Sequence, residues 1–242
     1  TPDCAPMSPP SQEAVVPSPC ANVSVVVAGA RVADTPDRPP TARAVSQTDV
    51  VLLDRDIRSV NIDGVFMDNY NSAYQSIQTF IDNGHTHIGI ISGPRTSTSG
   101  LARLNGYISA LQANNLPVRE DYILYGDFKF ELAYGLTKRL LAMGTDMTAI
   151  FASNSRMSMG CLLALAENGL KVPEDMAFIA CGKLGMNYGH ISSVVYPTSA
   201  IGAECARILL EKMQMGKKAR TGPKTVSYTH LRAHETVLAL VC

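Results

Sequence analysis

The stretch VFMDNYNSAYQSIQTFIDNGHTHIGIISGPRTSTSGLARLNGY, residues 65–107, decides the fold of this chain. Between residues 70 and 81, apolar side chains recur every three or four positions, which is the period of a helix with one buried face. Gly84 follows where a left-handed cap is needed, and residues 87–91 are almost all apolar, as in a parallel strand covered on both faces. A second helix is expected after the Ser-Gly-Pro of residues 92–94. Polar groups therefore gather at the carboxyl end of the strand, the edge where open α/β sheets bind ligands.

The same alternation of strand and helix continues along the chain. Short apolar runs predict strands at residues 50–53, 122–125, 149–152 and 176–181, and the last amphipathic helix is expected at residues 201–215. Strands that alternate with helices at this spacing imply right-handed crossovers and a parallel sheet. The predicted fold class is therefore α/β, with doubly wound parallel sheets.

The composition limits the kinds of partner. Lys and Arg number 21, as do Asp and Glu, so the chain has no overall basic charge to hold a nucleic-acid backbone, and DNA contact would need a segment outside it. No apolar run is long enough to span a bilayer and no signal peptide is recognisable, so we expect a cytoplasmic protein without a membrane partner. The six cysteines lack paired spacing and are expected to be free thiols.

The first 48 residues differ from the rest of the chain. Nine of the 14 prolines fall there, and only residues 23–27 resemble a strand. Proline-rich sequence forms few regular backbone hydrogen bonds. We therefore expect residues 1–48 to be poorly ordered or not native to the domain.

Several short motifs follow one another along the chain. They are Asp68-Asn69, Gly84-His85, Ser92-Gly93-Pro94, Arg103 with Gly106-Tyr107, Gly126-Asp127-Phe128, residues 149–154, Val172-Pro173-Glu174-Asp175 and residues 196–202. Together they resemble the effector-binding core of the LacI/GalR family of bacterial transcription regulators. The resemblance covers residues 50–224 and implies the type I periplasmic-binding-protein fold, in which three crossing segments join two Rossmann-like subdomains around a cleft. Residues 65–68 and 195–198 would be two of the crossings.

The resemblance also implies a division of the chain. Residues 68–197 would form the C-terminal, effector-binding subdomain. Residues 49–67 and 198–216 would be what remains of an incomplete N-terminal subdomain. Residues 226–242 do not match the family pattern, which has a strand ending in Arg-x-Ser there, so we expect them to be a non-native tail.

Arg103 and Ser99 are the first two candidate ligand contacts. Arg103 lies among apolar residues of the second predicted helix, and a guanidinium in such surroundings needs an anionic or multiply hydrogen-bonding partner. The resemblance implies that Arg103 faces the cleft and binds the effector, while an internal salt bridge is the alternative. Ser99, one turn earlier, matches a cleft position in the family, but it can equally be a plain helix cap.

Asn154 and Phe128 complete the candidate site. Asn154 follows the predicted strand at residues 149–152, where asparagine commonly caps a helix, and the resemblance implies that it also contacts the effector. Phe128 matches an aromatic residue that stacks on the effector in relatives, and a loop residue packed inward is the alternative. Two departures weaken any transfer of ligand identity. Ser155 stands where relatives have Asp, and Gly182 replaces the carboxylate that normally binds sugar hydroxyls or a purine.

Metal, cofactor and catalytic sites find no support in the sequence. His85 and His87 flank Thr86, but a metal would need further ligands, and a structural role in the turn is expected for His85. His230 and His234 have a spacing that could chelate a metal on a helix, but both lie in the tail that we expect to be non-native. Walker and dinucleotide-binding loops are absent, and no nucleophile has a supporting motif. We expect neither a metal nor a cofactor, and no enzyme activity.

The predicted function is the ligand-sensing core of a LacI-type transcription regulator. A sugar-like or purine-like metabolite would bind between the subdomains and modulate operator binding through a DNA-binding headpiece that this chain lacks; the intact protein would be a homodimer. The first alternative is a periplasmic sugar-binding protein of an ABC transporter, which shares the fold. The second is an enzyme on the same type of sheet, because fold does not determine function.

Overall fold

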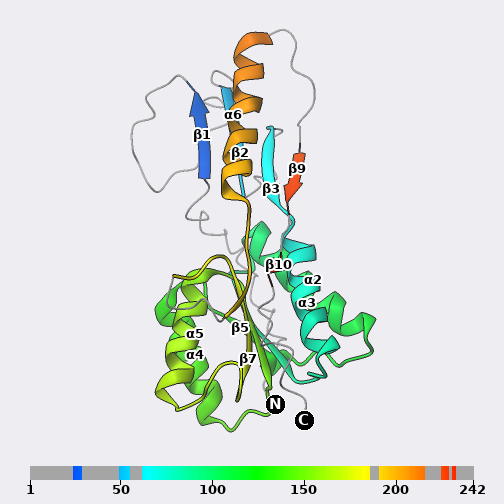
Figure 1. The fold of residues 1–242 in the computed structure, drawn as a ribbon, viewed down its shortest axis with the longest axis vertical. Helices are drawn as coiled ribbons and strands as arrows, with labels where there is room; N and C mark the ends of the chain where they lie inside the picture. The colour runs from blue at the N-terminus through cyan, green and yellow to red at the C-terminus, as the bar shows by residue number, and fades with distance from the viewer. Residues whose placement is uncertain are drawn as a thin grey trace, which may run out of the picture.

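Two sheets follow one another along the long axis of the molecule, the smaller above the larger in Figure 1. The computed structural model describes residues 24–28, 49–54, 62–185, 191–215, 225–228 and 231–232. For residues 24–28, 49, 215, 225–228 and 231–232 the description covers the backbone alone.

The large sheet is the more complete of the two. Its strand order is β10-β8-β7-β6-β4-β5, and all neighbours are parallel except β10 and β8. Every residue of β4, β6 and β7 is buried, as expected for parallel strands covered on both faces. The strands are β4 (Ile88–Ser92), β5 (Ile123–Tyr125), β6 (Ala149–Ala152), β7 (Ala177–Cys181), β8 (Ser192–Val194) and β10 (Leu231–Arg232).

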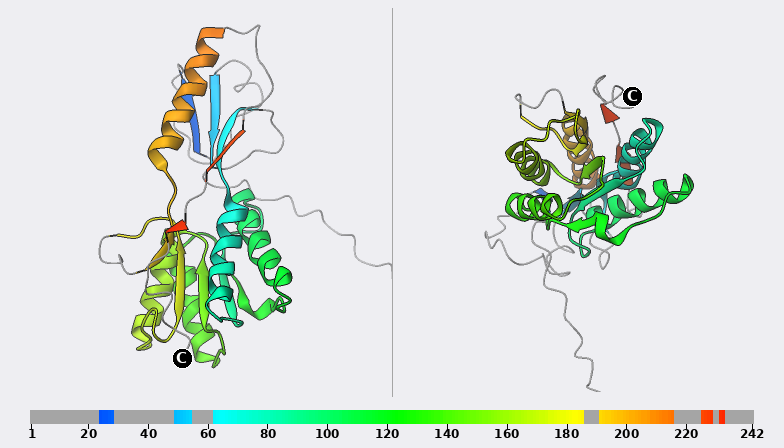
Figure 2. Two further views of the ribbon diagram at one scale, coloured as in Figure 1. Left: turned by 45° about the vertical axis from the view of Figure 1, so that its right-hand side comes forward. Right: turned by 90° about the horizontal axis from the view of Figure 1, so that it is seen from below.

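A pair of helices covers each face of this sheet, as the right-hand view of Figure 2 shows from below. The helices α2 (Asn69–Asp82) and α3 (Thr98–Ala113) pack on one face around Phe80 and Tyr107. The helices α4 (Phe130–Ala142) and α5 (Ser155–Glu167) pack on the other around Met157. The predicted doubly wound α/β class is thereby confirmed.

Local sequence signals account for the ends of these helices. Asp68 caps α2 by accepting a hydrogen bond from the Asn71 backbone N–H at 3.0 Å, and Asn154 caps α5 by accepting one from the Met157 N–H at 2.8 Å. Gly84 ends the turn after α2 with a φ of 84°, the left-handed conformation expected there. The strand predicted at residues 122–125 begins one residue later in the structure. Tyr122 belongs instead to the short 3-10 helix η1 (Glu120–Tyr122) before β5.

The small sheet has the order β1-β2-β3-β9, and α6 (Thr198–Met215) packs on it. Val51, Val65 and Ile208 belong to the core between this sheet and α6. Lys212 of α6 also forms an ion pair with Asp63 at 2.5 Å and donates a hydrogen bond to the Val50 carbonyl at 3.0 Å. The strands are β1 (Ser24–Ala28), β2 (Asp49–Leu53), β3 (Gly64–Met67) and β9 (Thr225–Tyr228).

Two strands at sheet edges depart from the prediction of parallel sheets. β1 pairs antiparallel with β2, and β10 pairs antiparallel with β8. An antiparallel neighbour needs no crossover helix, so an edge strand can join the sheet from either direction. The sequence gives no helix period between β1 and β2 that would have indicated which direction applies.

Among the elements that the structure describes, the chain passes between the two sheets at three places. β3 of the small sheet runs through Asp68 into α2, and β8 of the large sheet runs through residues 195–197 into α6. The third passage lies between β9 and β10, which belong to different sheets. Figure 2 shows the first two passages side by side between the halves. Tyr196 lies in the second passage and packs against the cores of both halves.

Part of the predicted domain division concerns segments that lie outside the described residues. Of residues 1–48, only β1 is described, near the strand expected at residues 23–27. Residues 225–228, of which 226–228 belong to the suspected tail, extend the small sheet beside β3, and residues 231–232 of the tail extend the large sheet. These six residues therefore take places in both sheets. The non-native origin of residues 226–242 stays a prediction.

Candidate functional site

The carboxyl ends of the parallel strands of the large sheet face the small sheet, and a cleft of about 250 Å³ opens there. Residues from both halves line it, including Asp54 directly after β2 and Ser99 in the first turn of α3. The remaining lining residues are Phe66, Met67, Asp68, Asn69, Tyr70, Thr98 and Ala102. The cleft thus lies at the sheet edge predicted to bind ligand.

Ser99 lies where the sequence predicted it, in the wall of the cleft. Only 3% of its surface is exposed, and its hydroxyl lies 3.1 Å from that of Ser97. Ser97, not Ser99, caps α3 by accepting a hydrogen bond from the Gly100 N–H at 3.4 Å. The capping alternative for Ser99 is therefore wrong, while its contact with a ligand stays a prediction.

Arg103 lies one helical turn beyond Ser99 and is 5% exposed. Its Nη1 donates a hydrogen bond to the Ser153 carbonyl at 2.8 Å, but its buried Nε has no partner among the described residues. Burial acts to lower the pKa of the guanidinium, yet the side chains of Cys181, Tyr196 and Asp54 together outweigh this and raise the pKa. Arg103 therefore stays charged with one unmatched donor, which is costly in a buried position.

Tyr196 and Cys181 surround the guanidinium from the side of β7. The Tyr196 hydroxyl and the Cys181 thiol lie 3.1 Å apart. Burial, followed by the effect of Cys181, raises the pKa of Tyr196 well above its usual range, so the phenol stays neutral. Among the described residues no carboxylate is within ion-pair distance of Arg103, so the internal salt bridge expected as the alternative is not observed there, although the charge of Asp54 helps to raise the pKa of Arg103.

Asn154 and Phe128 lie together at the same edge. The Asn154 side-chain oxygen caps α5, and its amide donates a hydrogen bond to the Phe128 carbonyl at 3.5 Å. Phe128 has a φ of 56°, a strained conformation for a bulky residue that is often found at functional sites. Its ring covers Gly93, where a Cβ would lie 2.2 Å from the Phe128 Cζ. The ring therefore lies over the end of β4.

Short contacts connect three of the four predicted residues. Arg103 is hydrogen-bonded to the backbone of Ser153, the next residue is Asn154, and Asn154 contacts Phe128. Ser99 lies on the same helix as Arg103 and lines the cleft. The structure thus gathers the four residues at one sheet edge, although Arg103, Asn154 and Phe128 are not among the residues that line the 250 Å³ cleft. Their contact with a ligand stays a prediction.

Asp54 and Asn69 were not singled out by the sequence. Asp54 has a φ of 66°, and Asp54 and Asn69 each have one buried side-chain oxygen that finds no partner among the described residues. Both line the cleft. The available signal was the position of Asp54 immediately after a buried strand, the same rule that selected Asn154.

Gly182 explains one departure from the family pattern. Its φ is 100°, and a Cβ on it would lie 2.5 Å from the Ser155 hydroxyl oxygen. A carboxylate side chain cannot be added there without strain and a shift of Ser155. The two positions that depart from the pattern are therefore in contact with each other.

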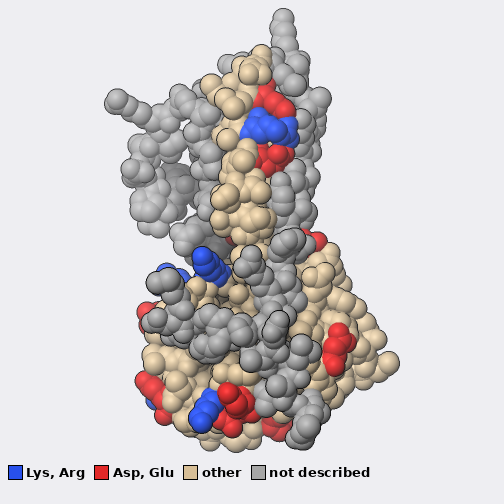
Figure 3. Space-filling model, in the orientation of Figure 1, with Lys and Arg blue, Asp and Glu red and all other residues tan. Residues whose placement is uncertain are grey.

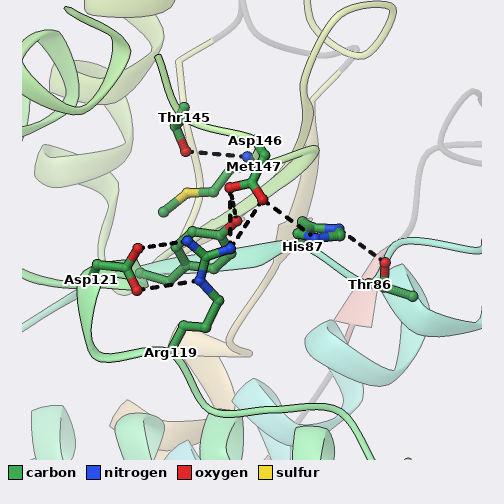
Figure 4. A network of polar contacts seen from close by, with 8 residues as sticks. Thr86, His87, Arg119, Asp121, Thr145, Asp146 and Met147 are labelled. Atoms are coloured by element: carbon green, nitrogen blue, oxygen red, sulfur yellow. Dashed lines mark hydrogen bonds and ion pairs between the residues drawn. The ribbon is translucent and has the colours of Figure 1, made fainter. Parts of the chain in front are cut away.

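The two histidines that the structure describes, His85 and His87, do not line the cleft. His85 is buried in the turn after α2, its Nδ1 lies 2.9 Å from the Thr148 hydroxyl, and burial lowers its pKa. Figure 4 shows His87 beside Asp146, with an ion-pair distance of 3.4 Å, in a network around Arg119 that lies at the starts of β4, β5 and β6. This is the sheet edge opposite the cleft. No cluster of three metal-binding side chains occurs within the described ranges, and His230 and His234 lie outside them.

The described part of the chain contains no helix that is both long and apolar enough to cross a bilayer.

Comparison with known proteins gives a consistent set of relatives. Residues 77–237 match the family described as periplasmic binding protein-like domain. The transcriptional repressor PurR of Actinobacillus pleuropneumoniae is 29% identical over 182 residues, which are 74% of this chain and 54% of PurR. The repressor CytR of Escherichia coli is 32% identical over 153 residues, which are 62% of this chain and 45% of CytR. The chain spans about half the length of these curated relatives.

Solved structures agree with the sequence relatives. A complex of the transcriptional regulator CelR with cellobiose is 30% identical, with a TM-score of 0.68, over 76% of this chain and 57% of CelR. A regulatory protein of the LacI family from Chloroflexus aggregans is 28% identical, with a TM-score of 0.67, over 75% of this chain and 66% of that protein.

Proposed function

The chain belongs to the periplasmic-binding-protein-like family and carries the effector-binding core of a LacI-type transcription regulator, and we propose from this premise that it binds a small metabolite between its two halves. The observation that carries the proposal is the buried Arg103, whose Nε lacks a partner at the sheet edge that faces the cleft. A ligand oxygen there would satisfy a donor whose burial is otherwise unfavourable. CelR, a relative with the same fold, has been solved with cellobiose in complex.

Ligand binding would act through the passages between the halves. Ser99 and Arg103 lie on the large half, whereas Asp54 belongs to the small half. A ligand that contacts both walls favours the arrangement in which they are close, and the free energy available is its difference in affinity for the two arrangements. Such coupling is typically about 1 to 3 kcal/mol. In an intact regulator this shift would change operator binding through a DNA-binding headpiece.

A homodimer is the second partner that we propose. Met159 and Leu163 lie one turn apart on α5 with 40% and 41% of their surfaces exposed, and Leu132 on α4 is 44% exposed. Exposed apolar side chains such as the neighbouring Met159 and Leu163 are typical of subunit contacts. Sedimentation equilibrium should give a dimer for the chain and a monomer for Leu163→Glu. A monomeric parent chain would contradict the proposal.

The proposed role is binding without turnover in the cytoplasm. The relatives described above are regulators of transcription, and none of the candidate residues forms a nucleophile–base pair. No observation favours the transport-receptor alternative, so it is not carried further.

The test is a thermal-shift screen with neutral sugars, sugar acids, sugar phosphates and purines, followed by calorimetric titration of each compound that raises the unfolding midpoint. Arg103→Met should weaken the binding of such a compound at least 100-fold, because it removes a charged donor from a buried site. Lys171→Gln, an exposed change before β7, serves as the matched control and should bind normally. Equal affinity in the parent and Arg103→Met would overturn the assignment of the site.

A further inference from the structure

Three buried polar groups at this sheet edge have no partner among the described residues, and none of them belongs to the residues that line the 250 Å³ cleft. They are the Ser92 hydroxyl at the end of β4, the Ser153 hydroxyl just after β6, and the Arg103 Nε. Ser92 is 1% exposed and Ser153 is fully buried. Every one of these groups can donate a hydrogen bond.

The strand register places the two serines next to each other. β4 and β6 are parallel neighbours in which Ile91 pairs with Ala152, so the following residues, Ser92 and Ser153, are also adjacent. Side chains alternate between the faces of a sheet. Ile90 and Phe151 belong to the core under α2 and α3, so the serines two positions later lie on that same face. Arg103 extends from α3 to the Ser153 carbonyl, which brings all three donors to one place.

The charge around this point is positive on the large half. Arg156 follows β6 and Lys183 follows β7, and both are exposed. Gly182 contacts Ser155, so the loops that carry the two cations are neighbours. Residues 147–166 and 176–203 contain no Asp or Glu. Figure 3 shows Lys and Arg side chains at the left of the lower half where it faces the upper half, and acidic surface at the right of the same boundary.

Three carboxylates lie near this edge, and one of them is paired with a cation. Asp127 forms an ion pair with Lys129 at 2.7 Å, and Asp68 accepts hydrogen bonds from Asn71 at 3.0 and 2.6 Å. Asp54 contributes to the potential at Arg103 from the opposite wall, but one of its oxygens remains without a donor. The large half therefore offers buried donors and exposed cations, and the small half offers Asp54 as an acceptor. Asp68 keeps its negative charge at the edge of the cleft, because its partner Asn71 is neutral.

We infer that the ligand is an anionic, hydroxylated metabolite, that is, a sugar acid or a sugar phosphate. Its carboxylate or phosphate would accept hydrogen bonds from Arg103, Ser92 and Ser153, since anions suit buried donors and cationic surroundings. Its hydroxyl groups would donate to Asp54 and Asn69 across the cleft. The N-termini of α3 and α5 lie at the same edge and add favourable dipoles. This inference rests on the proposed function and specifies its ligand class.

The experiment compares matched pairs of compounds at constant ionic strength by calorimetric titration and thermal shift. The pairs are D-glucuronate with D-glucose, D-galacturonate with D-galactose, glucose 6-phosphate with D-glucose, and ribose 5-phosphate with D-ribose. We expect at least one acid to bind at least 10-fold more tightly than its neutral parent. The first two pairs identify a carboxylate ligand and the last two a phosphate ligand.

Two further variants separate the buried donors from the exposed cations. The double variant Ser92→Ala with Ser153→Ala should weaken binding of the acid about 10-fold or more and leave the neutral parent within about two-fold, since each lost hydrogen bond to an anion removes a strong contact. Arg156→Gln with Lys183→Gln should weaken acid binding less, about three- to 10-fold, because exposed charges are screened. Lys171→Gln is the control at the opposite end of β7.

The outcomes distinguish this inference from the proposed function. If the neutral parents bind as tightly as the acids, the sensor function stands and the anionic ligand class is wrong. If acids bind preferentially but the serine and cation variants bind them unchanged, the assigned donors are wrong and the inference is overturned. If no compound of either kind binds, in these pairs or in the wider screen, both proposals fail.

Discussion

The two helix pairs on the large sheet pack closely in the same way, but they differ in the polar and apolar groups that they bury and expose. In each pair one glycine lets the helix backbones approach: a Cβ on Gly106 would lie 2.3 Å from the Tyr70 carbonyl oxygen, and one on Gly160 would lie 2.4 Å from that of Phe130. Beneath α2 and α3, however, the sheet buries polar groups without partners, whereas α4 and α5 expose apolar groups outward. The contrast is consistent with the two proposals made above, a ligand site on one face and a subunit contact on the other.

The largest expected effect concerns Gly106 and Gly160, the glycines at which the paired helices approach each other. Gly106→Ala and Gly160→Ala should each destabilise the protein by about 2 to 4 kcal/mol, because the added methyl group meets backbone atoms that cannot move aside cheaply. Chemical denaturation would measure this loss. Gly135→Ala is the matched control, since nothing lies near its Cβ position, and a helical glycine replaced by alanine should gain about 0.5 to 1 kcal/mol. Equal behaviour of the three variants would show that close helix approach is unimportant.

The second effect separates binding from stability on the α2–α3 face. Arg103→Met should change the free energy of unfolding by less than about 1.5 kcal/mol, because replacing a buried charge by an apolar side chain of similar size is often neutral or stabilising. Its ligand affinity should nevertheless fall at least 100-fold, as proposed above. A strongly destabilised Arg103→Met protein would instead show that Arg103 has a structural role. The proposed difference between the two faces of the sheet would then be wrong.

A smaller effect concerns the two serines. Ser92→Ala and Ser153→Ala should leave the ligand-free protein equally stable or about 1 kcal/mol more stable, because each removes a buried hydroxyl that has no partner. On the other face, Thr137 donates a hydrogen bond to the Ala133 carbonyl at 2.8 Å, so Thr137→Ala should destabilise the protein. Thermal unfolding of the three variants side by side measures the contrast, and serine variants that lose stability like Thr137→Ala would refute it.

The smallest expected effect is a pH dependence at His85, beneath α2 at the edge away from the cleft. Burial lowers the pKa of His85 below its ordinary value of 6.5, so the unfolded chain takes up a proton first as the pH falls. This residue should therefore reduce stability as the pH drops below about 6.5 and have no such effect above it. His85→Gln should show a shallower fall in midpoint between pH 7.5 and 5.5; an unchanged slope would assign the pH dependence elsewhere.

Sequence reasoning recovered the elements whose signals are local. The helix period before Gly84, the apolar runs of β4 and β6, and the cap at Asn154 each depend on neighbouring residues, and each is present in the structure. The direction of β1 and β10 was not recoverable, because strand pairing at a sheet edge depends on contacts far along the chain.

The candidate site shows the same limit. Ser99, Arg103, Asn154 and Phe128 were selected from strand ends and from a family resemblance, and the structure gathers them at one edge. Asp54, from the other half, could not be joined to them by sequence spacing. The unmatched donors of Ser92 and Ser153 depend on strand register and burial, which no motif reports.

Hydrogen exchange of the backbone amides, with and without the tightest-binding compound of the screen, tests the central claim most directly. We predict that the ligand slows exchange in two segments, residues 93–104 between β4 and α3 and residues 153–158 at the start of α5, and leaves the outer surface of α4 unchanged. Slowed exchange confined to α4 and the exposed side of α5, with the two segments unaffected, would contradict a ligand site at this sheet edge.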